Sequence, residues 1–461
     1  MANDWVHTKL GDIFKVKHGF AFKGEYFSDA PTNSFLLTPG NFSTSGGFQD
    51  IKPKYYDGPI PDDYILKPSQ VVVTMTDLSK QSDTLGYAVS IPNDGKVWLH
   101  NQRTGLLEFK KEYPSDPLFI SYLLRSHEYR SWIIGSATGT TVKHTSPTRI
   151  HDFECKIPPL SEQKAIAYIL GSLDDKIELN RQMNETLEAM AQALFKSWFV
   201  DFDPVIDNAL AAGNAIPDEF AERAEQRKGL EKKDNADIQK LFPDAFEFTE
   251  EMGWIPLGWD VDGFKNIVEK YIDNRGKTPP LSEFGIPLIE VKHISDYEIK
   301  PSLDTTKFVD RDTYNSWFRS YLQTDDIIIS TVGTIGRICM VANGEEFAIA
   351  QNLLGFRFKK TSVLPSFMYY QMDGFRFRHD VDARLVTTVQ ASIKRKDLET
   401  ISLLIPSIKV QKAFEVIVKP LMNKQNSNQN IQLAKLRDTL LPKLMSGELR
   451  IPDADAMTKE V

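Results

Sequence analysis

The sequence predicts an α+β protein, with two α/β domains in tandem and two long helices that form an intramolecular coiled coil. Three observations carry this prediction. A chain of 461 residues is too long for one ordinary core. Short segments recur at an offset of about 248 residues, and two helical segments have heptad-spaced apolar residues. A content of 41% hydrophobic and 26% charged residues is typical of a globular protein.

The internal repeat consists of six short segments that recur in the same order. They are Ile51-Lys52-Pro53 with Ile299-Lys300-Pro301, Val71-Val72-Val73-Thr74 with Ile327-Ile328-Ile329-Ser330, Thr84-Leu85-Gly86 with Thr334-Ile335-Gly336, Thr140-Thr141-Val142 with Thr387-Thr388-Val389, Ile157-Pro158 with Ile405-Pro406, and Gln163-Lys164-Ala165 with Gln411-Lys412-Ala413. A single match could arise by chance, but six in one order indicate a duplication.

Each copy has the same internal order. About 150 residues of short β-rich runs, clearest at 70–75 and 326–331, precede an amphipathic helix. We therefore divide the chain into a first domain (1–157), a first helix (158–200), an acidic linker (201–254), a second domain (255–405), a second helix (406–449) and a C-terminal tail (450–461).

The first helix is expected to begin after Pro158-Pro159, with Ser161 as its N-cap, and to run to about residue 199. The predicted helix–helix packing positions are Ile166, Leu170, Leu173, Ile177, Asn180, Leu187 and Leu194 in the first helix, and Phe414, Val418, Leu421, Asn428, Leu433 and Leu440 in the second. Buried asparagines at matching places fix the register of a coiled coil. The alternative is core packing within each half, but helices longer than about 25 residues favour a coiled coil.

The net charge of −8 is confined to one segment. Residues 201–251 contain 14 acidic and 6 basic residues, so the rest of the chain is neutral. A neutral remainder suggests weak phosphate binding by the chain alone, or a partner that supplies positive charge. We expect residues 201–254 to be a solvated linker with one short helix near 218–228.

Two separated cysteines, Cys155 and Cys339, suit a reducing compartment. The N-terminus lacks the pattern of a signal peptide, and no apolar run reaches the roughly 20 residues that a bilayer span needs. We expect a cytoplasmic protein with no membrane partner.

No motif for an enzyme cofactor, a phosphate loop or a zinc site is present, so we expect no cofactor, no metal and no catalysis. One alternative is a magnesium-dependent nuclease of the PD-(D/E)xK type that uses Asp273, Glu290 and Lys292. The first copy has Thr38-Pro39-Gly40 at the matching place, which counts against it. A second alternative is an assembly protein whose coiled coil joins partners without binding DNA.

The segments that flank the helices resemble those of the specificity subunit of type I restriction–modification systems. They are Ile157-Pro158-Pro159-Leu160-Ser161-Glu162-Gln163, Ala193-Leu194-Phe195-Lys196-Ser197-Trp198-Phe199-Val200-Asp201-Phe202-Asp203-Pro204, Leu241-Phe242-Pro243-Asp244, Ile255-Pro256-Leu257-Gly258-Trp259 and Leu440-Leu441-Pro442-Lys443-Leu444-Met445-Ser446-Gly447-Glu448-Leu449. The second helix departs from this pattern, because it has Lys409-Val410-Gln411 in place of the Glu-Gln pair.

The resemblance implies two α/β target recognition domains separated by two long antiparallel helices, with pseudo-two-fold symmetry. Each domain would bind one half of a bipartite site in the major groove of double-stranded DNA. Two methyltransferase (M) subunits would modify adenines, and translocase–nuclease (R) subunits would join them for cleavage. Half-sites that match the protein symmetry are the usual consequence of such an arrangement.

Base recognition in the major groove uses Arg or Lys for guanine and Asn or Gln for adenine. The predicted DNA-binding residues of that kind, with small polar neighbours, are Lys17, His18, Lys23, Asn41, Ser43, Asp77, Lys80, Gln81, Lys143, His144, Thr145, Arg275, Lys277, Lys292, His293, Thr334, Arg337, Gln390, Ser392 and Lys394. Each could instead be an ordinary solvated residue. The aromatic residues Phe20, Phe22, Phe356 and Phe358 are expected in the core rather than stacked on bases.

Overall fold

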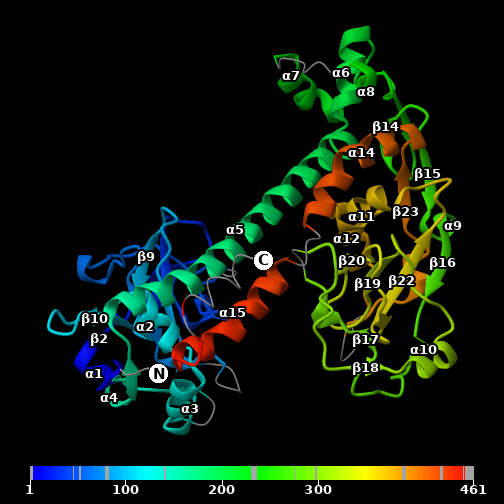
Figure 1. Cartoon of the computed structure of the whole chain (residues 1–461). Coiled ribbons are helices and arrows are strands. Elements are labelled where there is room, and N and C mark those ends of the chain that lie inside the picture. Colours follow the sequence, from blue (N-terminus) through cyan, green and yellow to red (C-terminus); the bar gives the residue numbers. More distant parts are fainter. Residues whose placement is uncertain are drawn as a thin grey trace. The chain divides into compact units, whose positions relative to one another are not determined.

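The structure is a computed structural model that describes residues 4–44, 46–50, 53–77, 83–139, 142–229, 236–274, 276–295, 298–386, 391–425, 429–449 and 451. It divides into two compact units. Unit 1 comprises residues 1–180 and 428–461, and unit 2 comprises residues 181–427. The boundary falls inside helix α5 (Leu160–Phe199), a single helix of 40 residues (Figure 1).

Unit 1 is built on two four-stranded sheets. The first has the order β2 (Phe14–His18), β10 (Thr104–Phe109), β6 (Val71–Thr74) and β8 (Ala88–Ser90). The second has the order β3 (Phe27–Ser28), β5 (Tyr55–Tyr56), β4 (Ser34–Leu37) and β9 (Val97–His100), with β4 parallel to β9. Two further pairs are β1 (Val6–Lys9) with β12 (Glu154–Ile157), and β7 (Thr76–Asp77) with β11 (Lys143–His144).

The helices of unit 1 are α1 (Leu10–Ile13), α2 (Pro117–Leu123), α3 (His127–Gly135), α4 (Pro147–His151), the first half of α5, and α15 (Gln429–Met445). Three short 3-10 helices are η1 (Gly24–Tyr26), η2 (Pro39–Asn41) and η3 (Asp62–Tyr64).

Unit 2 repeats the first four-stranded sheet of unit 1 and has a smaller second sheet. Its four-stranded sheet has the order β16 (Val268–Ile272), β22 (Leu353–Phe358), β19 (Ile327–Ser330) and β20 (Ile338–Met340). A three-stranded sheet contains β18 (Phe308–Val309), β17 (Ile286–Ile289) and β21 (Ala348–Ile349), with β17 parallel to β21. The remaining pairs are β13 (Phe246–Thr249) with β14 (Gly253–Pro256), and β15 (Asp260–Gly263) with β23 (Ser402–Ile405).

The helices of unit 2 are α6 (Asp203–Ala212), α7 (Ala221–Lys228), α8 (Ala236–Gln239), α9 (Phe264–Ile267), α10 (Arg311–Trp317), α11 (Pro365–Asp373), α12 (Phe375–Asp382), α13 (Arg395–Leu398) and α14 (Ile408–Gln425), with the 3-10 helices η4 (Asp218–Phe220) and η5 (Val291–His293). The second long helix is therefore described as two helices, α14 and α15. The predicted packing residue Asn428 lies outside the described residues.

The duplication predicted from the sequence is confirmed by the matching sheet orders. The two apolar runs predicted as strands form β6 and β19, and both are buried along their whole length because the two faces of each strand pack into different hydrophobic clusters. The repeated Thr-x-Gly segments place Gly86 and Gly336 at φ +80° and +81°. Glycine adopts this left-handed conformation at no steric cost, which explains its presence in both copies.

In unit 1, α5 packs antiparallel on α15. Asp174 of α5 accepts a hydrogen bond from Arg437 of α15 at 2.7 Å, whereas Asn180, further along α5, donates to Asn430 at 2.9 Å. The direction follows, because later residues of α5 meet earlier residues of α15. The predicted packing residues Ile166, Leu170, Leu173, Leu433 and Leu440 lie in one buried cluster of unit 1, with Ile177 packed at its margin.

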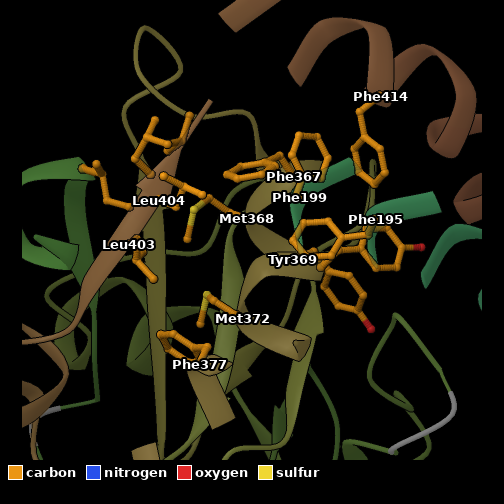
Figure 2. Close-up of a cluster of buried hydrophobic side chains, with 14 of the residues drawn as sticks. Phe195, Phe199, Phe367, Met368, Tyr369, Met372, Phe377, Leu403, Leu404 and Phe414 are labelled. Atoms are coloured by element: carbon orange, nitrogen blue, oxygen red, sulfur yellow. The ribbon is translucent and has the colours of Figure 1, made fainter. Parts of the chain in front are cut away.

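In unit 2, α5 packs on α14 through aromatic side chains. Figure 2 shows Phe195 and Phe199 of α5 beside Phe367 and Phe414. The ring centroids of Phe199 and Phe367 are 5.0 Å apart, and those of Phe195 and Phe414 are 5.9 Å apart. Of the predicted packing residues, Phe414 and Val418 are buried in this cluster, Leu194 and Leu421 lie at its margin, and Leu187 is half-buried.

The first helix begins at Leu160, one residue before the predicted N-cap Ser161, which therefore lies within the helix. The side chain of Gln163 joins the N-terminal end of α5 to the segments before it through hydrogen bonds. Its side chain is 1% exposed, accepts from the Asp116 backbone N–H at 2.9 Å and donates to the Pro158 carbonyl at 2.9 Å. Gln411 has the equivalent role in unit 2, where it accepts from the Leu364 N–H and donates to the Pro406 carbonyl.

The described residues of the segment 201–254, which we expected to form a solvated linker, are folded into unit 2 (201–229 and 236–254). Val205 and Ile206 of α6, Phe202 just before it and Ala224 of α7 are buried in the main cluster of unit 2. Their charges are paired, because Arg223 donates to Asp203 at 2.8 Å. The prediction of a solvated linker from the acidic composition is therefore wrong. Apolar residues spaced along the segment, and arginines paired with its aspartates, stabilise its folded structure. The short helix expected near 218–228 is present as η4 and α7.

Candidate nucleic-acid interface

In unit 1, backbone hydrogen bonds bring three loops that are distant in sequence to one edge of the first sheet. The Met75 N–H, after β6, donates to the Arg103 carbonyl at 2.9 Å. The Thr145 N–H donates to the Met75 carbonyl at 3.0 Å, and the Gln102 N–H donates to the Phe20 carbonyl at 3.0 Å. The loops after β2, β6 and β11 therefore surround the turn between β9 and β10.

Unit 2 has the same arrangement. The Thr331 N–H, after β19, donates to the Asn352 carbonyl at 2.9 Å, and the Ile393 N–H donates to the Thr331 carbonyl at 3.0 Å. The Ala350 N–H donates to the Ile289 carbonyl at 2.8 Å, which adds the end of β17 to the same edge. The duplicated fold therefore presents a matching set of loops in each unit.

The predicted DNA-binding residues differ in exposure. The exposed ones are His18, Lys23, His144, Lys277, Lys292, Thr334 and Lys394. The half-buried ones are Lys17, Ser43, Lys143, Thr145, Arg337 and Ser392. The buried ones are Asn41, Asp77 and His293. Lys80, Gln81, Arg275 and Gln390 lie outside the described residues.

The three buried side chains hold their own loops. Asn41 accepts from the Thr38 backbone N–H at 2.8 Å, and His293 accepts from the Glu290 backbone N–H at 2.9 Å through Nδ1. Burial lowers the pKa of His293, which favours the neutral imidazole that can accept this bond. Asp77 accepts from the Thr84 backbone N–H at 2.6 Å. Because the side-chain acceptors of these three residues are bonded to backbone N–H groups, the residues stabilise the conformation of their loops and are not exposed for DNA contacts.

Two of the half-buried cations also have partners within their domains. Lys17 Nζ donates to the Asp63 carbonyl at 2.9 Å and lies 5.1 Å from the centre of the Tyr64 ring. Arg337 Nη1 donates to the Ile294 carbonyl at 3.3 Å. Both could reach a phosphate only with some rearrangement, so the exposed cations are the better candidates for phosphate contacts.

Of the nuclease-like residues of unit 2, Glu290 is paired with two lysines. Glu290 accepts from Lys307 Nζ at 2.6 Å and lies 3.5 Å from Lys292 Nζ. Burial raises the pKa of Glu290, but Lys307 and Lys292 outweigh it, so the pKa lies below its ordinary value. In the part of the chain that the structure describes, no group of three or more His, Cys, Asp or Glu residues could hold a metal ion. Glu290 occupies the place of Thr38, which caps η2 as Glu290 caps η5.

The aromatic residues expected in the core are placed there. Phe22, Phe356 and Phe358 are at most 5% exposed, and Phe20 packs at the margin of the cluster that contains Phe22. Their rings pack against one another, at 5.1 Å for Phe20 and Phe22 and 6.1 Å for Phe356 and Phe358. The buried rings of Phe22, Phe356 and Phe358 are therefore not exposed for stacking on a base, and the half-buried ring of Phe20 packs against Phe22.

Two glutamines at this edge were not among the predicted contacts. Gln102 and Gln351 lie in the turns that follow β9 and β21, and both are exposed. They are 249 residues apart, within the range of offsets of the other repeated segments. The spacing was a usable signal, but an isolated glutamine in a divergent stretch does not stand out without the strands on either side.

None of the described helices is long and apolar enough to cross a membrane.

Comparisons with known proteins agree on one family. The model of the type I restriction modification DNA specificity domain matches residues 2–189. The chain is 28% identical over 370 residues to the type I restriction enzyme HindI specificity subunit of Haemophilus influenzae, covering 72% of this chain and 77% of that protein. It is 24% identical over 466 residues to the type I restriction enzyme EcoBI specificity subunit of Escherichia coli, covering 97% of this chain and 86% of that protein.

A solved structure has the same fold. The type I restriction–modification S subunit from M. genitalium matches with a TM-score of 0.53 and 16% identity, and the match covers 96% of both chains. This likeness extends through both copies of the repeat and both helical segments. The family model and the sequence relatives thus make the chain similar to type I restriction–modification specificity subunits, and the solved structure shows that it shares their fold.

Proposed function

We propose that this chain is the DNA-binding specificity subunit of a type I restriction–modification complex. Each recognition domain binds one half of a bipartite site in double-stranded DNA. The observation that carries the proposal is the pair of matching loop clusters, which gather exposed Lys and Gln side chains at the same edge of the same sheet in both units, with exposed His18 and His144 in unit 1. Such residue types contact phosphates and base edges.

Partner subunits supply the chemistry in this proposal. Two methyltransferase subunits modify adenines in the site, and translocase–nuclease subunits join for cleavage. The names of the relatives, which are specificity subunits of restriction enzymes, support such partners. The part of the chain outside the segment 201–251 has no net charge, so positive charge from partners would strengthen the binding to DNA.

The central test is a methylation map. The chain is expressed with methyltransferase subunits in cells that lack other adenine methylation, and N6-methyladenine is mapped across the genome. We expect one split motif, with two short defined halves and a gap of fixed length. A continuous motif, or methylation without sequence preference, would contradict the proposal.

The long helices are proposed to set the gap. Deleting two turns from α5 and the same length from α14 and α15 should shorten the gap in the methylation map and leave both half-sites unchanged. Half-sites that change while the gap stays constant would refute this role.

The chain itself is proposed to be non-catalytic. Purified chain incubated with Mg²⁺ and plasmid DNA should leave the plasmid intact. Cleavage by the wild-type chain that disappears in Glu290→Ala would reveal a nuclease instead.

A further inference from the structure

The turn between the last two strands of each recognition domain has the same construction in both units. In unit 1, the Thr104 N–H donates to the Asn101 carbonyl at 3.0 Å and closes a four-residue turn. In unit 2, the Leu353 N–H donates to the Ala350 carbonyl at 3.1 Å and closes the same turn. Gln102 and Gln351 are the second residues of these turns, so they occupy equivalent positions.

Hydrogen bonds from neighbouring residues fix the backbone of both turns. In unit 1 the side chain of His100, which is 1% exposed, bonds through Nε2 to the Thr104 carbonyl at 3.1 Å. Burial lowers the pKa of His100 to about 4, so the imidazole is neutral at physiological pH and donates this bond. The Arg103 N–H donates to Asn101 Oδ1 at 3.1 Å. In unit 2 the Asn352 carbonyl accepts from the backbone N–H and the hydroxyl of Thr331.

The glutamine side chains are free to bind a ligand. Both are exposed, and neither amide has a hydrogen-bond partner among the described residues. A glutamine amide offers one donor and one acceptor on the same planar group. Adenine presents the complementary pair, the N7 acceptor and the N6 donor, in the major groove. Because the backbone is fixed, binding would cost mainly the rotamer freedom of one side chain.

The position of the turns favours a base contact over a phosphate contact. Each turn lies at the centre of the loop cluster, since the loops after β2 and β6 bond to the turn in unit 1 and the loop after β19 bonds to it in unit 2. Exposed cations lie in the surrounding loops, such as Lys23 after β2 in unit 1 and Lys394, next to Ile393, in unit 2. Cations around a neutral amide are arranged as expected for phosphates at the rim and a base edge at the centre.

We propose that Gln102 and Gln351 are adenine-reading residues, each of which contacts one A·T pair in the half-site of its own domain. The proposal rests on the proposed function and deepens it, because it names the base and the side chain. It requires at least one such pair in each half of the split motif, read by the same chemistry in both.

The test uses the complete chain with methyltransferase subunits and the methylation map described above. Gln102→Ala should weaken the preference at one A·T pair of one half-site by roughly ten- to a hundredfold and leave the other half unchanged. Gln351→Ala should do the same to the other half. As a matched control, Gln226→Ala changes an exposed glutamine on α7 and should leave the motif unaltered.

A second pair of variants separates base reading from a structural role. Glutamate accepts a hydrogen bond from the N4 amine of cytosine, so Gln102→Glu and Gln351→Glu should move the preference at the same position from A·T to C·G. A variant that is merely unfolded loses methylation of the whole motif and cannot acquire a new base preference.

The outcomes are distinguishable. An unchanged motif in both alanine variants, or equal weakening of both half-sites by either one, would overturn the adenine-reading assignment and leave the proposed function intact. Absence of a split motif with the wild-type chain would overturn both.

Discussion

We predict that replacing the side chain of Gln411 lowers the stability of unit 2. It is 0% exposed at the start of α14. Its Oε1 accepts from the Leu364 N–H at 2.8 Å, and its Nε2 donates to the carbonyls of Pro406 at 2.8 Å and Ser362 at 3.0 Å. It therefore joins the first turn of α14 to the start of α11. Gln411→Leu keeps the volume of the side chain and removes all three bonds.

The magnitude follows from which groups lose their partners. Leu364 and Pro406 are buried, so their backbone groups cannot be satisfied by water, whereas Ser362 is exposed and can be hydrated. Two unsatisfied buried groups cost about 1–3 kcal/mol each, so we expect a loss of roughly 2–6 kcal/mol in the free energy of unfolding. For a unit of this size that corresponds to a fall in Tm of about 5–20 °C.

The assay is thermal and urea unfolding, followed by circular dichroism and tryptophan fluorescence. Gln163→Leu should lose less, roughly 1–3 kcal/mol, because only the Pro158 carbonyl is fully buried there and the Asp116 N–H is half-buried. The control is Lys412→Leu, an exposed neighbour of Gln411, which should change stability by less than about 0.5 kcal/mol. Equal midpoints for Gln411→Leu and Lys412→Leu would refute the reasoning.

Three further predictions concern charged groups and base choice. Burial raises the pKa of Asp174, but Arg125 and Arg437 outweigh it and hold the pKa below the ordinary value of 3.8. The stabilisation is thus present above that value and lost as the pH falls below it, and Asp174→Asn should flatten this part of the stability–pH curve and cost about 1–3 kcal/mol at pH 7. Burial raises the pKa of Glu188 in unit 2 despite hydrogen bonds from Gln425 and Gln192, so its contribution to stability falls as the pH rises above 4.5. We therefore compare the urea midpoints of Glu188→Gln and the wild-type chain at two pH values. The midpoint of the variant minus that of the wild type should be larger at pH 7 than at pH 4, and an equal difference at both pH values would contradict this. Arg103 follows Gln102 and is exposed, whereas Asn352 follows Gln351. We therefore expect Arg103 to contact a guanine next to the glutamine-read pair, so Arg103→Asn should change that guanine to adenine in the methylation map, and a retained guanine would count against this contact.

Several features could be predicted because their signals are local or repeated. The buried runs that form β6 and β19 are continuous apolar segments between turn residues, and their type does not depend on a distant partner. The heptad spacing placed Leu170 and Phe414 in cores, since helical periodicity alone decides which face is apolar. Asn180 and Asn430 also meet, although the matching Asn428 lies outside the described residues.

Composition was a poorer guide than spacing. The acidic segment after α5 was expected to be solvated, yet Phe202 and Val205 are buried and Asp203 pairs with Arg223 and Arg227. A count of charges does not reveal which of them are paired. Partners twenty residues apart are brought together by the packing of α6 on α7, which no local pattern reports.

By itself, the sequence determined that the chain is a duplication with one fold in each copy and long helical segments after each. Only the tertiary structure decided which polar residues of the loops are available. Asn41 and Asp77 are buried and hold their loops, whereas Gln102 and Gln351 are presented at the turns. The physical reason is that apolar periodicity is a property of a single segment and can be recognised within it. The exposure of a loop side chain depends instead on backbone hydrogen bonds from strands and loops far away in the chain.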